Sequence, residues 1–374
     1  MLDLERQYAP LREELLEALA GVLDSRQFIL GDAVAAFERS AAEQLGVAHA
    51  VGCSSGTDAL WLALAAAGIG PGSAVITSPF SFFASVSSIL RAGATPVLAD
   101  IDPATFNLSP AAVEVVLEGP GAREIRAVLP VHLYGQCASF SGFGQDRRLT
   151  IIEDAAQAWG AEWKGKKAGS LGDIAAFSFY PTKNLSAAGD AGMVATNSAS
   201  LAERAGMLRQ HGMRRRYYHD EPGWNARMDG FQGAVLAVKL RYIEGWTEAR
   251  RLVAARYDAL FRAAGLAERS PYPGKGVVLP REVQGARHVW HQYVIRAPRR
   301  DALRDFLSAR QIGSEIYYPV PLHMQKALAG LGYKEGDFPE AERAAREVLA
   351  LPIFPELRED EQQTVVAAIA EFLS

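Results

Sequence analysis

The chain has 374 residues, and 49% of them are hydrophobic, which is enough to bury a large core. Its 39 lysines and arginines nearly balance its 43 aspartates and glutamates, for a formal net charge of −4, which argues against nucleic acid or an acidic membrane surface as a partner. The two cysteines, Cys53 and Cys137, have no paired spacing. With only these two cysteines, we expect neither a disulfide scaffold nor a thiolate zinc site, and a reducing compartment fits the sequence.

The first residues carry acids among their apolar side chains, unlike a secretory signal. A membrane-spanning helix needs about 18 or more uninterrupted apolar residues, and the chain has no such stretch. The longest candidate, Ala59 to Ile69, is short enough to be a buried helix. We therefore expect a soluble, cytoplasmic protein of enzyme size.

The first half of the chain alternates short apolar runs with helical patterns, which is typical of α/β proteins. The expected strands are His49–Gly52, Ala74–Thr77, Thr95–Asp100, Ala127–Val131, Thr150–Asp154, Ile174–Phe179 and Gly192–Thr196. Helical patterns between them include Thr57–Ala67, Ser81–Ala92 and Pro110–Leu117. Several strands are apolar on both faces, which predicts a sheet covered by helices on each side.

The pattern changes near Leu236, where Leu236–Ala264 predicts one long amphipathic helix or two joined helices. A second, smaller α/β unit is expected to follow. Its predicted elements are a strand near Tyr293–Arg296 and helices near Asp301–Arg310, Glu340–Ala350 and Glu359–Leu373. We predict a large domain over residues 1–245 and a small C-terminal domain over residues 246–374.

The segment Ser54–Leu60 follows a strand and opens a helix. Gly56 allows close backbone approach, and Thr57 can cap the helix while it offers a hydroxyl group. The free N–H groups of a helix N-terminus bind phosphate. The alternative is an ordinary capped helix after a tight turn.

Glu153 and Asp154 end the apolar run Thr150–Ile152, where a carboxylate is costly unless a cation faces it. A pyridinium nitrogen is one such cation. At about 4 Å and an effective dielectric near 20, the attraction is about 4 kcal/mol, enough to keep the ring protonated. The alternative is that Asp154 caps a helix at the strand exit.

Lys183 lies in a short loop after the strand that ends near Phe179, and Pro181 stops that strand. A lysine becomes an imine-forming nucleophile when its surroundings disfavour the ammonium form. Ser178, at the strand end, could bind the phosphate of a cofactor held by that lysine. A single lysine in a loop is more often solvated, so its neighbours in the sequence matter.

Two other features have mainly structural interpretations. The run Arg214–Arg216, beside aromatic residues, could clamp a pyrophosphate or belong to a solvated loop. His288 and His291 have possible ligand spacing, but no carboxylate or cysteine cluster lies nearby in the sequence, so we expect no metal site.

Seven segments in order resemble the DegT/DnrJ/StrS family of sugar aminotransferases, within the fold-type I pyridoxal-phosphate enzymes. They are Ser55–Leu60, Pro79–Ser85, Glu153–Gln157, Ser178–Leu185, Gly189–Gly192, Gly223–Asp229 and Tyr318–His323. The resemblance covers about residues 25–325, and Ala191 departs from it where many relatives have glycine. It implies a mostly parallel seven-stranded sheet flanked by helices, with a smaller C-terminal α/β domain.

The resemblance also implies a role for each matching residue. Lys183 would carry pyridoxal 5'-phosphate as a Schiff base and move protons once released, with the cofactor cycling through pyridoxamine 5'-phosphate. Asp154 would pair with the pyridine nitrogen, so that the ring acts as an electron sink. The remaining cofactor contacts would be Gln157 to the phenolic oxygen, Phe82 on the ring face, and Gly56, Thr57 and Ser178 at the phosphate.

Further implied contacts concern the partner subunit and the substrate. Asn225 would reach the cofactor phosphate of the neighbouring subunit, which makes the active unit a homodimer with shared sites. Arg227, Tyr317 and His323 would contact a nucleotide-linked keto-sugar. The implied reaction is a transamination with glutamate as the amino donor. The alternatives are a dehydratase of the same fold, whose members replace the lysine with histidine, and a non-catalytic regulator that would lack Lys183 or Asp154.

Overall fold

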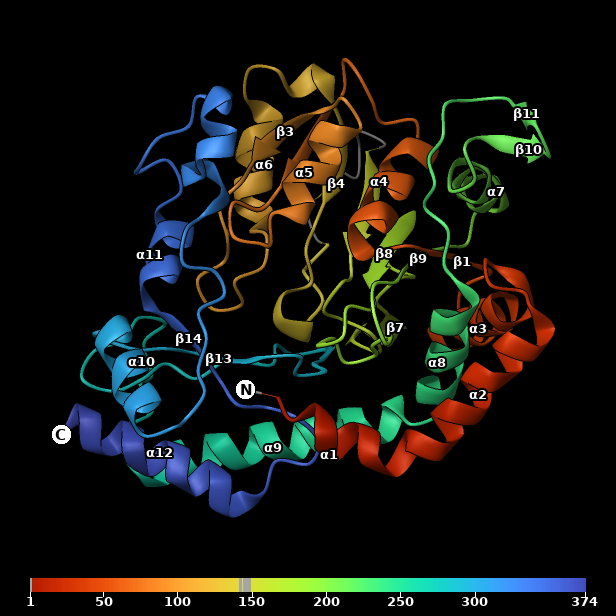
Figure 1. The fold of residues 1–374 in the computed structure, drawn as a ribbon. Helices are drawn as coiled ribbons and strands as arrows, with labels where there is room; N and C mark the ends of the chain where they lie inside the picture. Colours follow the sequence, from red (N-terminus) through yellow and green to blue (C-terminus); the bar gives the residue numbers. More distant parts are fainter. Residues whose placement is uncertain (1, 141–142, 144–148) are drawn as a thin grey trace.

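The structure, a computed structural model, describes residues 2–140, 143 and 149–374. Its centre is a seven-stranded sheet in the order β1-β9-β8-β5-β4-β2-β3 (Figure 1). The strands are β1 (His49–Cys53), β2 (Ala74–Thr77), β3 (Thr95–Leu98), β4 (Ile125–Leu129), β5 (Thr150–Asp154), β8 (Ile174–Ser178) and β9 (Gly192–Thr196). All seven predicted strands are confirmed, with ends that differ by at most two residues.

The direction of the strands brings their carboxyl ends to one edge of the sheet. Strands β2, β3, β4, β5 and β8 pair in parallel, and β9 runs antiparallel to both of its neighbours, β1 and β8. Residues that follow β1, β2, β4, β5 and β8 therefore meet at the same edge, where open α/β sheets bind ligands. Gly192 begins β9 at this edge, and a Cβ there would lie 2.2 Å from the carbonyl oxygen of Ser55. Only glycine allows β9 to lie this close to the residues that precede α4.

Helices cover both faces of the sheet, as expected for strands that are apolar on each side. Alternate residues of β8 show this, because Ile174 and Ala176 pack in one core and Ala175 and Phe177 in another. The helices of the first core are α4 (Gly56–Ala66), α5 (Ala84–Arg91) and α7 (Ala199–Leu208). Those on the other face are α3 (Gly31–Leu45), α6 (Pro110–Glu118) and α8 (Gly230–Leu240).

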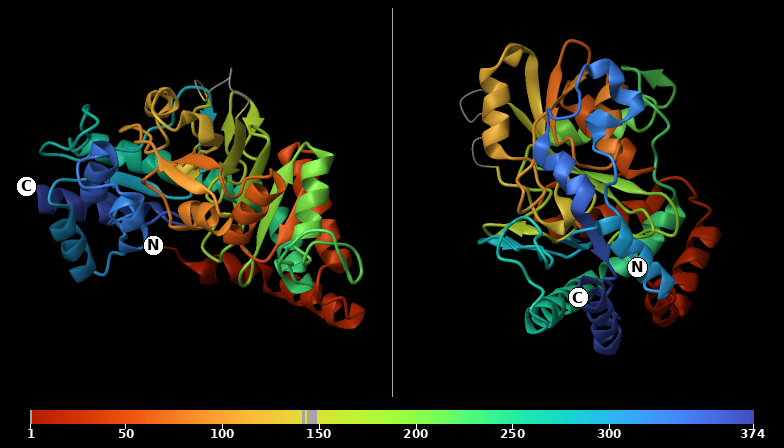
Figure 2. Two further views of the ribbon diagram at one scale, coloured as in Figure 1. Left: turned by 90° about the horizontal axis from the view of Figure 1, so that it is seen from above. Right: turned by 90° about the vertical axis from the view of Figure 1, so that its left-hand side faces the viewer.

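The C-terminal part begins along α9 (Ile243–Ala263), which follows α8 after two residues, so the predicted helical stretch consists of two joined helices. A short antiparallel pair follows with its helices: β13 (Tyr293–Arg296), β14 (Val348–Leu351), α10 (Arg300–Ala309), α11 (Pro339–Glu347) and α12 (Glu359–Leu373). Helix α12 lies alongside α9, as two views show (Figures 1 and 2). The predicted domain boundary after residue 245 falls inside α9, and the two-domain division stays a prediction.

The helix predicted for Glu340–Ala350 is wrong at its end. Helix α11 stops at Glu347, and the next four residues form β14, which is buried along its whole length. The run Val348–Leu351 has no polar position that could face solvent, so it pairs with β13 inside the core.

The remaining elements are short or peripheral. They are α1 (Leu4–Tyr8), α2 (Arg12–Ser25), β6 (Glu162–Trp163), β7 (Lys166–Lys167), β10 (Met213–Arg215), β11 (Tyr218–His219) and β12 (Ala286–Arg287). Strands β10 and β11 form an exposed hairpin, which contains the arginine run Arg214–Arg216. Within the described ranges, no helix is both long and apolar enough to cross a membrane.

Candidate active site

The two acidic residues that end β5 have different surroundings. The buried Glu153 carboxylate accepts hydrogen bonds of 2.7–2.8 Å from three backbone N–H groups in the segment 169–172. His132 Nε2 lies 2.9 Å from it, and His132 Nδ1 accepts a hydrogen bond from the Ala138 N–H group. The proton of a neutral His132 ring therefore sits on Nε2 and is donated to Glu153. Glu153 is thus fully bonded within the chain.

Asp154 is also buried, at 4% exposure, but has fewer partners. Its Oδ2 accepts a hydrogen bond from Ser85 Oγ at 2.7 Å, and its Oδ1 accepts one from the Ala156 N–H group at 3.3 Å. Burial raises the pKa of Asp154, while the Ser85 hydrogen bond and the positive charge of Lys183 act in the opposite direction. A carboxylate can accept about four hydrogen bonds, so Asp154 has capacity left for a cationic partner. The residues directly after Asp154 form turns and not a helix, so the helix-cap interpretation is wrong.

Lys183 lies in the loop after β8, where its N–H group donates to the carbonyl oxygen of Tyr180 at 2.8 Å. The residue keeps part of its surface exposed, but the surrounding protein desolvates its amine. Desolvation lowers the pKa of Lys183 to about 8, although the nearby Asp154 charge favours the ammonium form. A larger share of uncharged amine is therefore present at neutral pH than for an ordinary lysine, which favours nucleophilic attack.

A second buried lysine shows that a lowered pKa alone does not identify a nucleophile. Burial lowers the pKa of Lys239 to about 7. Its Nζ donates to Ser186 Oγ at 2.5 Å and to the Tyr8 hydroxyl at 3.1 Å, and it also lies 4.4 Å from the centre of the Tyr8 ring. Lys239 is therefore fully enclosed, whereas Lys183 is partly exposed and within electrostatic reach of Asp154.

Two strand ends meet where a phosphate could bind. A Cβ on Gly56, the first residue of α4, would lie 2.5 Å from the Cβ of Ser178, so only glycine allows this approach. Ser55 Oγ accepts a hydrogen bond from the Asp58 N–H group and caps α4, so the expectation that Thr57 caps the helix is wrong. Among the residues that the structure describes, the Thr57 hydroxyl has no hydrogen-bond partner. The helix N-terminus and two nearby hydroxyls thus offer donors to an anion.

Gln157 connects the β5 end to the C-terminal part of the chain. Its Nε2 lies 3.2 Å from the Tyr318 hydroxyl, and its Oε1 is buried without a hydrogen-bond partner in the described structure. If the amide is turned over, Tyr318 donates to Oε1 and the NH2 group becomes free to bind an external oxygen. Phe82 is 61% exposed, and its ring centre lies 6.4 Å from that of Tyr318. An exposed aromatic ring therefore lies beside Tyr318, which in turn contacts this amide.

Asn225 is exposed and Arg227 is partly exposed on a segment that runs beside β1. Arg227 pairs with Cys53 in a backbone bridge, and its Nε donates to Asn225 Oδ1 at 3.0 Å. The Asn225 NH2 group thus stays available to an acceptor outside the described contacts. Asp229 caps α8 through the Gln232 N–H group, so Asn225 is not the cap of this helix.

The other two predicted substrate contacts lie in different environments. Tyr317 is half-buried, and its carbonyl oxygen accepts a hydrogen bond from the Tyr134 hydroxyl. His323 has a fully buried side chain, whose Nε2 lies 3.1 Å from Glu342 Oε1. Its ring also packs edge-on against Phe338. His323 thus faces the interior and an acidic partner, while its Nδ1 is buried without a hydrogen-bond partner in the described structure, and its predicted substrate contact stays a prediction.

Three residues near the site were not predicted individually. Ser85 bonds Asp154, Tyr318 lies beside Gln157, and His132 bonds Glu153. Ser85 and Tyr318 are the last and first residues of two segments in the family resemblance, but nothing in one sequence assigns them these contacts. His132 follows β4 by three residues, and only the parallel sheet brings it to β5.

The fold and these groups define a pyridoxal-phosphate-dependent enzyme of the aminotransferase class. A sequence model of the DegT/DnrJ/EryC1/StrS aminotransferase family matches residues 10–370. The chain belongs to this family.

Individual relatives match over nearly their whole length. The chain is 49% identical to a protein of Geobacillus stearothermophilus named pleiotropic regulatory protein, covering 100% of this chain and 98% of the relative. It is 42% identical to a UDP-N-acetyl-3-dehydro-alpha-D-glucosamine 3-aminotransferase of Acidithiobacillus ferrooxidans, covering 100% and 97%. The crystal structure of DesV from S. venezuelae, in complex with a ketimine intermediate, has a TM-score of 0.93 and 41% identity, covering 100% and 97%.

The residues present fit pyridoxal phosphate. Asp154 has acceptor capacity for a pyridinium N–H group, and Gln157 has an unpartnered amide atom at the same strand end. Gly56 has no room for a side chain beside Ser178, as expected where a backbone must approach a phosphate closely. Lys183 supplies an amine whose ammonium form is disfavoured.

Proposed function

We propose that this enzyme transfers an amino group to a nucleotide-linked keto-sugar, a dTDP- or UDP-keto-hexose, with glutamate as the donor and pyridoxal phosphate held covalently by Lys183. The single observation that carries the proposal is the pair formed by Lys183 and Asp154. A desolvated amine and a buried carboxylate with unused acceptor capacity influence one another at the carboxyl edge of the sheet. The product would be an amino sugar for polysaccharide or glycoside biosynthesis.

Each residue has a defined task in this proposal. When bound, pyridoxal phosphate supplies an electron sink for the bond changes at the substrate carbon. Asp154 keeps the ring nitrogen protonated, and Ser85 keeps the Asp154 carboxylate oriented. Lys183 Nζ acts first as a general base, which removes a proton from the carbon that bears the amino group of glutamate. It then acts as a general acid, which gives a proton back. Gly56, Thr57 and Ser178 hold the phosphate, Gln157 binds the phenolic oxygen, and Phe82 covers the ring.

The substrate class rests on the named relatives. The Acidithiobacillus relative is named for a UDP-linked 3-keto-sugar, which supports a nucleotide-linked sugar here. The candidates for contacts to it are Arg227, Tyr317 and the buried His323. We also propose a cytoplasmic location, which is consistent with Cys53 and Cys137, both free thiols buried in the fold.

The test is a screen of the purified enzyme with glutamate against dTDP- and UDP-linked 3-keto- and 4-keto-sugars, with amino-sugar product measured by mass. We expect one nucleotide and one keto position to give product, with 2-oxoglutarate formed in equal amount. The Lys183→Ala variant is the matched control and should give none. Turnover of none of the sugars by an enzyme that binds pyridoxal phosphate would contradict the substrate class.

A regulatory role is the second candidate, because the Geobacillus relative is named as a regulatory protein. Lys183 and Asp154 are both present here, and a regulator has no need for either group at a desolvated site. The glutamate half-reaction separates the two functions, because a regulator that has lost catalysis forms no 2-oxoglutarate, whereas an aminotransferase with another acceptor still converts glutamate once.

We further propose a homodimer in which Asn225 completes the partner's cofactor site. The support is the exposed side chain of Asn225, whose NH2 group has no acceptor among the residues described. Exposed apolar residues also lie near this segment, including Phe28 and Ile29, which are 44% and 53% exposed. Ile29 bridges to Asp229, four residues after Asn225. An isologous interface would cover this surface and complete both sites symmetrically.

Co-expression of two inactive variants tests the shared site. Lys183→Ala and Asn225→Ala/Arg227→Ala should each lose most activity alone. A heterodimer of the two would place both lesions in one composite site and leave the other site intact. We expect recovery of up to one working site in two. If confirmed heterodimers show no recovery, Asn225 acts within its own chain.

A further inference from the structure

The side chain of Asn184, the residue after Lys183, is buried and held by a distant segment. Its Nδ2 donates to the carbonyl oxygen of Val289 at 3.1 Å, and its Oδ1 lies 2.9 Å from His291 Nδ1. Since the Val289 oxygen can only accept, the NH2 group must face it, and Oδ1 must face His291. The His291 proton therefore sits on Nδ1, and that ring nitrogen donates to Asn184.

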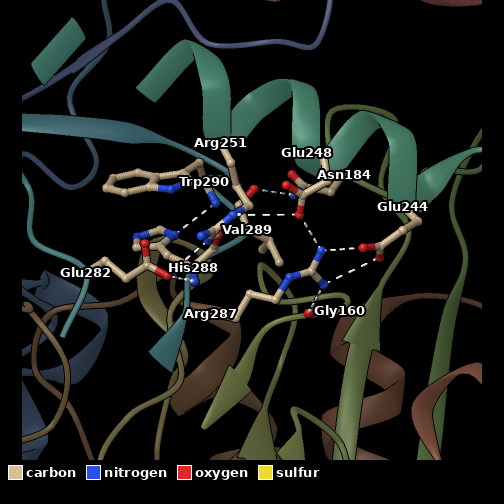
Figure 3. Close-up of polar contacts among 10 residues, drawn as sticks. All are labelled: Gly160, Asn184, Glu244, Glu248, Arg251, Glu282, Arg287, His288, Val289 and Trp290. Atoms are coloured by element: carbon tan, nitrogen blue, oxygen red, sulfur yellow. Dashed lines mark hydrogen bonds and ion pairs between the residues drawn. The ribbon is translucent and has the colours of Figure 1, made fainter. Parts of the chain in front are cut away.

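The segment 287–291, called here the strap, is anchored both to helix α9 and to the loop after β5, as the contacts of its residues 287–290 show (Figure 3). On one side, Arg251 of α9 donates to the His288 carbonyl oxygen at 2.9 Å, and Arg287 pairs with Glu248 of α9 at 2.7 Å. On the other side, Arg287 also donates to the carbonyl oxygen of Gly160, which lies after β5. The strap thus joins helix α9 to the loop region of the catalytic sheet.

Trp290 shows that packing determines the shape of the strap. Its φ is +48°, a conformation that bulky residues rarely adopt. Its backbone N–H group donates to His288 Nδ1 at 2.8 Å, and its indole ring stacks on the His288 ring with 3.9 Å between the ring centres. Arg250 donates to the Trp290 carbonyl oxygen at 3.3 Å. Such a conformation persists only where several contacts enforce it, so contacts other than the one to Asn184 hold the residue next to His291 in place.

His291 remains uncharged in this setting. Burial and, next in effect, the positive charge of Lys183 hold the pKa of His291 well below its usual range, with Arg250 and His288 acting in the same direction. A neutral ring keeps its single proton on Nδ1 for Asn184. It also adds no charge beside the amine of Lys183.

We propose that His291 is a positioning residue for the reaction: its Nδ1–H group holds Asn184 and thereby fixes the backbone that carries Lys183. The inference rests on the proposed function of Lys183 as the amine that binds the cofactor. The described backbone hydrogen bonds that hold this loop near the lysine are the Lys183 N–H bond to Tyr180 and, four residues later, the Ala187 N–H bond to Phe179. The contact through Asn184 fixes the stretch between them.

Two substitutions of His291 separate this role from simple packing. Asparagine places an amide NH2 group near the position of Nδ1, whereas glutamine places it near Nε2. Both remove the ring and should lower Tm to a similar extent. We expect His291→Gln to slow the glutamate half-reaction by about 10²-fold, because a small misplacement of a catalytic group has that effect. His291→Asn should recover most of the rate.

Hydrogen–deuterium exchange of the cofactor-free protein gives a readout that is independent of activity. The peptide over residues 182–188 should exchange faster in His291→Gln than in the parent, and His291→Asn should restore its protection. A double variant, His291→Gln with Asn184→Ala, should react no more slowly than the worse of the two single variants. The reason is that both substitutions remove the same hydrogen bond, the one between His291 and Asn184.

Three outcomes would overturn the proposal. Equal losses of rate in the two variants, in proportion to Tm, would mean that the ring acts only in packing. Retained activity in His291→Gln with loss in His291→Asn would place the function at Nε2. If peptide 182–188 exchanges at the parental rate in both His291 variants, His291 does not hold the loop that carries Lys183. The parent enzyme is the control for the function itself, because failure of the parent to bind pyridoxal phosphate or turn over would contradict the proposed function instead.

Discussion

Replacing Lys183 with alanine is expected to abolish turnover while the fold and non-covalent binding of pyridoxal phosphate persist. The substitution removes both the amine that would link the cofactor and the group that would move the proton. General acid–base catalysis alone contributes roughly 10²–10⁴-fold, so the loss should be at least that large. The measurement is single-turnover product formation with glutamate, together with the near-violet absorption of the parent protein, which the variant should lose.

Borohydride reduction of the parent protein locates the linkage. We expect the cofactor label on the peptide that contains Lys183, as found by mass spectrometry. Lys239 is the informative comparison, because burial also lowers its pKa but encloses it between Tyr8 and Ser186. Lys166 is the exposed comparison. A label on either of these lysines would show that the site assignment is wrong.

Asp154→Asn should slow the glutamate half-reaction by orders of magnitude and leave the fold intact. The amide keeps the shape of the side chain but removes the charge that would hold the ring nitrogen protonated. A charge pair at about 4 Å is worth about 4 kcal/mol at an effective dielectric near 20, which corresponds to roughly 10³-fold in rate. The measurement is the half-reaction rate followed by stopped-flow absorption.

Glu153→Gln is the matched control for Asp154→Asn. Glu153 is the neighbouring carboxylate, but three backbone N–H groups and His132 already bond it. Its loss should therefore lower Tm more strongly than Asp154→Asn does, and its half-reaction rate should fall less. If Asp154→Asn reacts at close to the parental rate, the carboxylate has no role at the ring.

The sheet could be predicted from the sequence because each strand carries its own signal. Short apolar runs such as Ala74–Thr77 and Gly192–Thr196 are buried on both faces, and turn residues bound them. Reading elements from local patterns failed at Val348–Leu351, where a helix was predicted and a strand is found. A helical pattern runs there directly into an apolar strand. Helical periodicity in Pro339–Glu347 extends to the residues that follow, and only pairing with β13 shows the change.

The candidate site could be predicted only in part, because its contacts join distant segments. The positions of Asp154 and Lys183 at strand ends follow from the order of strands and loops. The difference between Glu153 and Asp154 does not, since it depends on N–H groups of the segment 169–172 and on Ser85. The burial of His323 against Glu342 and the hydrogen bond from His291 to Asn184 likewise arise from tertiary packing.

The place of β9 in the sheet has a consequence for synthesis of the chain. Strand β1, which leads into Gly56, pairs within the sheet only with β9, and β9 separates it from β8, which leads into Ser178. A nascent chain that ends before residue 192 therefore leaves β1 without a paired strand. In such a chain no strand holds Gly56 beside Ser178, the two residues between which a phosphate could bind. Such long-range pairing is slow and exposes strand edges to aggregation. Because a ligand that binds only the native state stabilises it, cofactor supply during translation would favour chains in which β9 has inserted.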